Sequence, residues 1–493
     1  MNPMNFVDLN QMNRVLLLAL VTATGCVSSA PTRGPATGGS PPALTRTLAP
    51  APASSSAVDA SVIAEASVRS HMTFLAGDAL NGRGSGTRDE WIAAEYLGAQ
   101  MLQWGIEPLG DNGGFVQEIE IERYETTTPP VMIVGSTRYT HGQNIQIQSL
   151  SAAKVAGALR TFAAASPAPP GSVVLMPETL PQGYQASVSA AAAILLLESP
   201  QMSSRRTPSR RLPAPAARLV GVPAGAPIRP SIVVLDKAAY AAMAGVPQGT
   251  QISIEADVKP APRTRTWNAV GRITGSDPSA SSQVILLSAH LDHVGNRPPR
   301  DGSTGADTIY NGADDDASGS VAVLELARAL ALGPRPKRTI VFAFFGSEEA
   351  GGFGSRFFAD RPVVPLSQIV ANLQFEMLGR PDNKVPAQTL WLTGYERSTL
   401  GPELARQGAK LVQDPHPEEN FFTRSDNIQF ARRGVIAHTV SSFGLHKEYH
   451  QASDEVRHIN FAHMTGAIRS MLGPIRWLAD SGFTPEWLPG MKP

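Results

Sequence analysis

Three apolar runs of six or seven residues mark the C-terminal half of the chain. They span residues 284–289, 339–345 and 369–375 and are rich in branched and aromatic side chains. Near-continuous apolar runs of this length are typical of strands buried on both faces of a sheet. Between the first two, residues 317–332 carry apolar residues at helical spacing and predict a helix. This alternation predicts an α/β fold with a mostly parallel-centred sheet flanked by helices.

Helical patterns also occur nearer the N-terminus. Apolar spacing predicts one helix over residues 64–75 and a second over residues 88–104. The Thr87 hydroxyl can accept hydrogen bonds from the first free N–H groups of the second helix, and Gly105 is suited to end it. The glycine-rich segment at residues 81–86 predicts a turn between the two helices.

A different pattern fills residues 126–262. Short apolar runs such as residues 172–176 alternate with connections rich in proline and glycine, and the alanine-rich residues 186–193 predict a helix that leads into the next run. We find no catalytic constellation in this segment. We therefore predict a small β-rich domain, inserted into a larger domain made of residues 61–125 and 263–485.

The first 60 residues do not look like part of a folded domain. Arg14 precedes a short apolar run, residues 15–23, and small residues lead to Cys26, the only cysteine. This pattern predicts a secretory signal over residues 1–26 and resembles a bacterial lipoprotein signal, in which such a cysteine is lipidated. The alternative is ordinary cleavage nearby. Residues 27–60 are rich in Pro, Ala and Ser and predict a disordered linker.

The charge balance argues against electrostatic partners. The 493 residues include 42 Lys and Arg and 42 Asp and Glu, so the formal net charge is zero. A balanced chain gives no reason to expect binding to nucleic acid or to an anionic membrane surface. Contact with a membrane is therefore expected only through a lipid anchor at Cys26.

Polar clusters follow the three predicted strands directly. His290 and Asp292 follow the first, Glu348 and Glu349 follow the second, and Glu376 follows the third. An acidic loop, residues 311–319, opens the helix between the first two strands. Sites in open α/β sheets form at the carboxyl ends of strands, so these side chains should meet at one edge.

Taken alone, each cluster has an ordinary explanation as a solvated or helix-capping group. Glu376 is harder to explain in this way, because it ends an apolar run and a buried carboxylate needs a partner or a metal. Carboxylates and imidazole converging on one edge indicate a divalent metal centre, with zinc as the first choice.

The order of these motifs resembles that of the M28 family of zinc peptidases. The carriers are His-x-Asp at residue 290, Gly-Ala-Asp-Asp-Asp-Ala-Ser-Gly at 312–319, Glu-Glu at 348, the strand-end acid and a late histidine. The resemblance covers residues 267–478 and extends to the N-terminal helices. It implies two Zn²⁺ ions and a general base, Glu348. The metal ligands that it implies are His290, Asp315, Glu349, Glu376 and His450.

The resemblance also implies which ligands would hold each metal ion. Asp315 would bridge the ions, with His290 and Glu376 on one side and Glu349 and His450 on the other. Glu348 beside two cations should have a low pKa.

Asp292 and the choice of the late histidine complete the expected site. Asp292 should hydrogen-bond His290 and orient it, whereas Asp314 and Asp316 receive no definite role. His450 is chosen because an acid that supports the region follows it, and His446 is the alternative.

The strand-end acid departs from the simplest members of the family, which carry Asp where this chain has Glu376. The inserted segment resembles a protease-associated domain.

The function implied is that of an exported dizinc aminopeptidase acting on peptides, in the periplasm or anchored to the outer membrane as a lipoprotein. Three alternatives remain at this point. They are a carboxypeptidase, a glutaminyl-cyclase-like enzyme that typically holds one zinc, and a non-catalytic binding protein that keeps the fold.

Overall fold

The computed structural model describes residues 59–164, 166–181, 183–199, 212–222, 230–298 and 306–493. The described residues do not include the predicted signal over residues 1–26 with Cys26. They also leave out nearly all of the predicted linker over residues 27–60. Within the described part of the chain, no helix combines the length and the apolar character needed to cross a membrane.

A ten-stranded sheet forms the centre of the larger domain. Its first half runs β10 (Arg218–Leu219), β2 (Val116–Glu122), β14 (Thr264–Ile273), β18 (Thr339–Phe345) and β15 (Val284–His290). It continues with β19 (Ile369–Phe375), β22 (Ala437–Ser441), β20 (Leu390–Leu392) and β21 (Leu411–Gln413), while β1 (Glu107–Pro108) pairs with β14. The four central strands β18, β15, β19 and β22 are parallel, and antiparallel pairs flank them. The predicted mixed α/β class and its parallel-centred sheet are confirmed.

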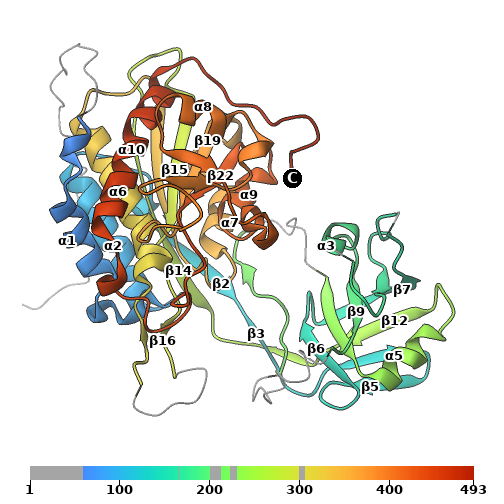
Figure 1. Ribbon diagram of the computed structural model, residues 1–493. Coiled ribbons are helices and arrows are strands. Elements are labelled where there is room, and N and C mark those ends of the chain that lie inside the picture. Colours follow the sequence, from blue (N-terminus) through green and yellow to red (C-terminus); the bar gives the residue numbers. More distant parts are fainter. Residues whose placement is uncertain (1–58, 165, 182, 200–211, 223–229, 299–305) are drawn as a thin grey trace, which may run out of the picture. The chain divides into compact units, whose positions relative to one another are not determined.

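Helices cover both faces of this sheet (Figure 1). One face packs on α1 (Glu65–Leu75), α2 (Arg88–Gln103), α6 (Gly319–Leu332), α8 (Leu400–Arg406) and α10 (Phe461–Asp480). The other packs on α7 (Phe353–Asp360) and α9 (Asn427–Ala431). Successive residues of β15 therefore enter opposite cores, and all seven are buried. This two-sided burial is why the strands read as continuous apolar runs.

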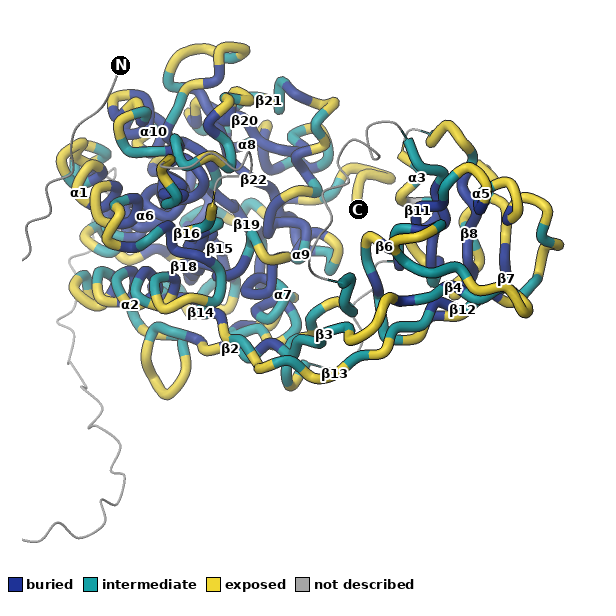
Figure 2. Tube along the Cα trace, turned by 90° about the horizontal axis from the view of Figure 1, so that it is seen from below, coloured by how far each residue is buried: buried dark blue, intermediate teal, exposed yellow. Residues whose placement is uncertain are grey.

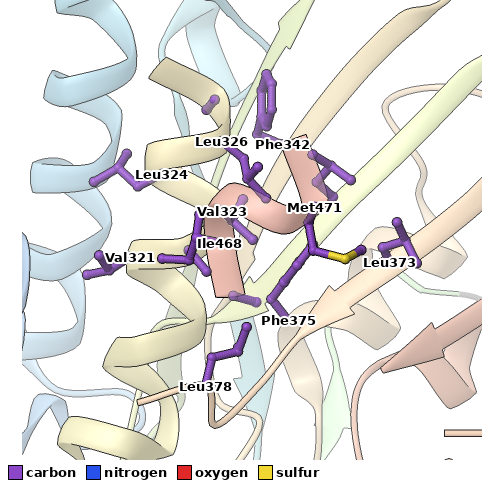
Figure 3. Packing of buried hydrophobic residues seen from close by; sticks show 14 of the residues in the cluster. Val321, Val323, Leu324, Leu326, Phe342, Leu373, Phe375, Leu378, Ile468 and Met471 are labelled. Atoms are coloured by element: carbon purple, nitrogen blue, oxygen red, sulfur yellow. The ribbon is translucent and has the colours of Figure 1, made fainter. Parts of the chain in front are cut away.

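The larger core lies between α6, α10 and the central strands. Figure 3 shows Val323 and Leu326 of α6, Ile468 and Met471 of α10, and side chains of β18 and β19 in contact within it. Figure 2 shows α6 and the central strands as the most continuously buried part of this domain, with exposed outer turns on α1 and α2.

The N-terminal helices agree with the sequence pattern. The Thr87 hydroxyl accepts hydrogen bonds from the N–H groups of Asp89 and Glu90 at the start of α2. Gly105, with a φ of +72°, follows the end of that helix. The positive φ explains why glycine occupies this position.

Residues between β3 (Tyr124–Thr126) and β13 (Val258–Pro260), which pair with each other, build a second sheet of eight strands. Its order is β5 (Thr137–Thr140), β4 (Val131–Val134), β12 (Gln251–Glu255), β7 (Lys154–Thr161), β8 (Val173–Leu175), β9 (Ala193–Leu197), β11 (Ser231–Leu235) and β6 (Ile145–Ser149). It has its own apolar core, which includes Leu159, Leu195 and Val233. Helix α5 (Lys237–Ala244) packs on this core through Ala239 and Met243.

Two details of this region differ from the prediction. The helix expected over residues 186–193 is only α3 (Tyr184–Ser187), followed by a turn into β9. So short an alanine run cannot offset the cost of helix nucleation without packing. In addition, β10 lies within the expected insert but pairs with β2 in the large sheet.

Arg83 joins the N-terminal segment to the loops beyond β15. Its side chain is 1% exposed and donates hydrogen bonds to four backbone carbonyls. Those of Leu291, Asn311 and Gly312 lie at 2.9, 2.8 and 3.0 Å, and the fourth is Leu75. The glycine-rich turn thus places a guanidinium directly behind the acidic loop.

We expect Arg83→Lys to lower the free energy of unfolding by about 3 kcal/mol, because an ammonium group cannot reach all four carbonyls and buried acceptors would be left unpaired. Urea denaturation would measure the change. Arg406→Lys is the matched control, since Arg406 is exposed and pairs with Glu403 on the surface of the same helix, and it should cost less than about 1 kcal/mol. Equal stability of the two variants would contradict the role given to Arg83.

Candidate metal centre

The parallel strands β18, β15 and β19 end at one edge of the sheet. His290 is the last residue of β15 and lies opposite Phe345, the last residue of β18. Glu376 follows β19 directly, and its N–H donates to the carbonyl of Val440 at 3.0 Å. Because parallel strands in register carry their C-terminal residues to the same edge, His290, the Glu348–Glu349 pair and Glu376 meet there.

Asp315 lies between two imidazoles. Its Oδ1 is 3.1 Å from Nε2 of His290, and its Oδ2 is 3.1 Å from Nε2 of His450. The carboxylate is nearly fully buried. One oxygen facing each histidine is the arrangement that a carboxylate bridging two cations requires.

Glu349 completes one side of this arrangement. Its Oε1 lies 3.0 Å from Nε2 of His450 and 2.9 Å from Nδ1 of His293. His293, Asp315 and Glu349 offer ligand atoms that all lie within 4.8 Å of one another. The side chain of His450 is 23% exposed, so the centre opens to solvent on this side.

Glu376 lies on the other side and is held by Ser425, whose hydroxyl donates a hydrogen bond to it. Burial raises the pKa of Glu376 to about 7, against the attraction of His290 and with the added repulsion of Asp315. The structure thus gathers Asp315, His290, His450 and Glu349 in contacts of 3.1 Å or less and places Glu376 within electrostatic reach of the first two.

The carboxylate of Asp292 bonds to the backbone of Glu348 and Glu349 rather than to the His290 ring. Its Oδ1 accepts the N–H of Glu348 at 2.9 Å, and its Oδ2 accepts the N–H of Glu349 at 3.3 Å and the Ser85 hydroxyl at 2.5 Å. Nδ1 of His290 is instead 3.2 Å from the Asp292 carbonyl and 3.7 Å from its carboxylate. The expected carboxylate–imidazole bond is replaced by a carbonyl contact, because backbone amides already engage both carboxylate oxygens.

The other two acids of the loop brace the backbone. Asp316 accepts N–H groups from His290 at 3.2 Å, Gly319 at 2.9 Å and Met377 at 3.1 Å. It therefore ties β15, α6 and the end of β19 together. The peptide bond between Asp315 and Asp316 is cis.

The carboxylate of Asp314 does not join Asp315 between His290 and His450 but bonds other partners. It accepts the N–H of Gly379 at 2.7 Å, and its Oδ2 is 2.8 Å from Nε2 of His446. His446, the alternative late histidine, therefore pairs with Asp314, whereas His450 lies against Asp315 and Glu349.

Asp454 is the acid that supports the region around His450. Its carboxylate accepts the N–H groups of Asp314 and Asp315, each at 3.1 Å, and its carbonyl accepts the N–H of Ala313. Burial and the neighbouring Asp314 charge raise the pKa of Asp454 to about 6. The segment that carries His450 thus also fixes the backbone of the bridging aspartate.

The residues at this edge suit divalent cations. Burial, with the charges of Asp426 and Glu376, raises the pKa of Glu348 well above its usual range, although His290 opposes the shift. This differs from the low pKa expected beside two cations, because the protein alone surrounds Glu348 with other acids. In addition, Oε1 of Glu349 is buried and has no hydrogen-bond partner in the described part of the chain. Bound cations would offset the cost of burying several carboxylates close together, one of them with an unpaired oxygen.

His293 is a member of the centre that the sequence prediction left out. The signal was present, since His293 lies three residues after His290 in the same motif. Asp426, buried and bonded by Ser355, was also missed, because nothing in the local sequence distinguishes it.

Comparison with known proteins relates this part of the chain to a family of peptidases. The pattern of peptidase family M28 matches residues 268–472. Leupeptin-inactivating enzyme 1 of Streptomyces exfoliatus is 32% identical over 209 residues, which are 39% of this chain and 44% of that protein. Leucine aminopeptidase 2 of Trichophyton equinum is 28% identical over 222 residues, 40% of this chain and 41% of that protein. The chain therefore spans less than half the length of these relatives.

Solved structures with a similar fold include an aminopeptidase from Aneurinibacillus sp. strain AM-1, with a TM-score of 0.49 and 16% identity over 88% of this chain and 97% of that one. A zinc aminopeptidase from Bacillus subtilis, BSAP, has a TM-score of 0.46 and 18% identity over 85% and 96%.

The fold and the site together define an α/β protein with a candidate metal centre at the carboxyl edge of its sheet. Residues 268–472, which carry that edge, are similar to peptidase family M28.

We expect Asp454→Asn to weaken metal binding by about 10–100-fold, because its amide group would face the N–H donors of the loop that holds Asp315. Competition with a chromogenic chelator would measure the affinity. Glu455→Gln is the control, since Glu455 pairs with Arg457 and accepts no N–H from the loop in the bonds described here. Unchanged affinity in Asp454→Asn would contradict the bracing role.

Proposed function

We propose that the chain is a dizinc aminopeptidase that hydrolyses the N-terminal peptide bond of peptides. The observation that carries the proposal is Asp315, which has one carboxylate oxygen facing His290 and the other facing His450. The M28 match over residues 268–472 and relatives named as aminopeptidases support it.

The five ligands would divide around Asp315. His290 and Glu376 would hold one Zn²⁺ with it, and Glu349 and His450 would hold the other. When bound, the ions would lower the pKa of a water molecule and polarise the scissile carbonyl. A glutaminyl-cyclase-like enzyme or a non-catalytic binding protein would not need all five ligands together with Glu348, which favours the dizinc peptidase over both.

Glu348 is positioned for proton transfer. Asp292 holds its backbone N–H at 2.9 Å, which fixes the start of the side chain at the mouth of the centre. Its carboxylate would take a proton from the attacking water and deliver it to the leaving amine. Asp292 is thus a positioning residue for the base.

A pocket beside Glu376 could receive the substrate side chain. Aromatic side chains of Trp391, Phe421, Phe443 and Tyr449 line it. Arg424 also lines it, but its guanidinium is 3.1 Å from Glu419 and stacks on Phe421, so its charge is already compensated. An acid-rich centre suits a substrate α-amino group better than a terminal carboxylate, which favours an aminopeptidase over a carboxypeptidase.

Two further proposals concern the inserted segment and the route of export. We propose that residues 126–262 form a non-catalytic, protease-associated-like domain, since none of the expected site residues falls within it. We also propose export as a lipoprotein through Cys26. A relative named as a probable lipoprotein aminopeptidase, LpqL of Mycobacterium tuberculosis, is 32% identical over 126 residues, 25% of this chain and 23% of that protein.

Zinc content and hydrolysis of aminoacyl chromogenic substrates test the activity. We expect about two zinc ions per chain and release of apolar N-terminal residues, which a chelator abolishes and added Zn²⁺ restores. Substrates with an acetylated amino group should resist cleavage, since they lack the positive charge. Cleavage from the carboxyl end instead would support the carboxypeptidase, and no hydrolysis by the zinc-loaded protein would contradict an enzyme.

Two substitutions should separate the base from the bridge. Glu348→Gln should keep both zinc ions and lower kcat by at least about 10²-fold, because only the proton acceptor is removed. Asp315→Ala should lose metal as well as activity. Metal analysis beside steady-state kinetics measures both effects. Full activity in Glu348→Gln, or full zinc content in Asp315→Ala, would remove the corresponding assignment.

A further inference from the structure

His293 is held in place from both sides of its backbone. Its N–H donates to the carbonyl of Arg83 at 3.1 Å, and its own carbonyl accepts the N–H of Ser85 at 3.2 Å. The ring packs against Gly312, where an added Cβ would lie 2.4 Å from the His293 Cγ. The glycine-rich turn and the start of the acidic loop therefore fix both the position and the direction of this imidazole.

The polar atoms of the ring are buried without hydrogen bonds. His293 is 0% exposed, and neither Nδ1 nor Nε2 has a hydrogen-bond partner among the residues that the structure describes. Nδ1 is nevertheless only 2.9 Å from Oε1 of Glu349, which also has none. Leaving such atoms unpaired in a buried site is destabilising. Two atoms this close without hydrogen-bond geometry suit a shared cation.

Nδ1 of His293 belongs to the same group of donors as the expected ligands. It lies 3.9 Å from Oδ2 of Asp315, while Nε2 of His450 lies 3.1 Å from that oxygen and 3.0 Å from Oε1 of Glu349. Donors bound to one tetrahedral zinc at about 2.0–2.1 Å lie roughly 3.3 Å apart. The distances around Asp315 and Glu349 bracket that value.

We infer that Nδ1 of His293 is an additional ligand of the ion that Asp315, Glu349 and His450 hold, so that the metal centre uses three imidazoles. The inference rests on the proposed dizinc function. It makes the two positions unequal, because one ion has four protein ligands and the other, with His290, Asp315 and Glu376, has three. Four protein ligands are typical of closed zinc sites, whereas three leave a position for water or substrate.

Paramagnetic proton NMR of the full chain loaded with two Co²⁺ ions tests the ligand count. Each imidazole bound to Co²⁺ through one nitrogen keeps an exchangeable N–H on the other, and this proton gives a strongly shifted signal that disappears in D₂O. We expect three such signals. Only two, in a protein that binds both ions, would overturn the inference without any substitution.

His293→Ala should remove one of the three signals and weaken the binding of one ion by at least about 100-fold. His71→Ala is the matched control, because His71 is also buried and lies 3.4 Å from a carboxylate, that of Glu325, in the helical layer. It should keep three signals and both affinities. Three signals that all persist in His293→Ala would also overturn the inference.

The failure of the proposed function would look different. A chain that binds no Co²⁺, or that binds it and cleaves no peptide, counts against the dizinc peptidase itself. An active, cobalt-loaded enzyme with two shifted N–H signals counts against His293 alone.

Discussion

Mutual repulsion among buried carboxylates at one sheet edge is the constraint on which the rest of the site depends. Burying an acid is costly unless hydrogen bonds or positive charge offset the lost hydration. The protein meets this constraint with backbone amides for four acids, namely Asp292, Asp314, Asp316 and Asp454. Each of these joins separate segments of chain, so groups that would otherwise be destabilising also define the geometry of the edge.

The acids that remain have no comparable set of amides. Asp315 and Glu349 face imidazoles, and Glu376 is bonded to the Ser425 hydroxyl. Although burial and the Asp315 charge oppose its ionisation, His293 and His450 hold the pKa of Glu349 at about 2. Burial and the charge of Asp315 instead raise the pKa of Glu376, although His290 opposes the shift. The acids at this edge therefore fall into two groups. One group accepts backbone N–H groups and fixes the loops, and the other keeps carboxylate oxygens that can bind metal ions.

The central strands of the sheet could be predicted from the sequence, because near-continuous apolar runs are typical of strands covered by helices on both faces. Glu376 could be singled out since it ends such a run, and Thr87 and Gly105 carry cap signals that need no tertiary context. The pairing of β10 with β2 could not be predicted, because two residues give no periodicity. The partners of Asp292 and Asp314 depend on segments more than fifty residues away, and His293 was hidden by a motif in which His290 had already been assigned.

Arg83 places a permanent positive charge near the acids of this edge without forming hydrogen bonds to their carboxylates. Burial lowers the pKa of Arg83, whereas Asp292, Asp316, Asp454 and Asp315 raise it, so its charge and theirs are coupled. All of its hydrogen bonds described here go to backbone carbonyls, and none goes to a carboxylate. A guanidinium paired directly with Asp315 would occupy the oxygens that must face the histidines. By binding carbonyls of the same loop, Arg83 stabilises the acids through space and leaves both carboxylate oxygens of Asp315 facing His290 and His450.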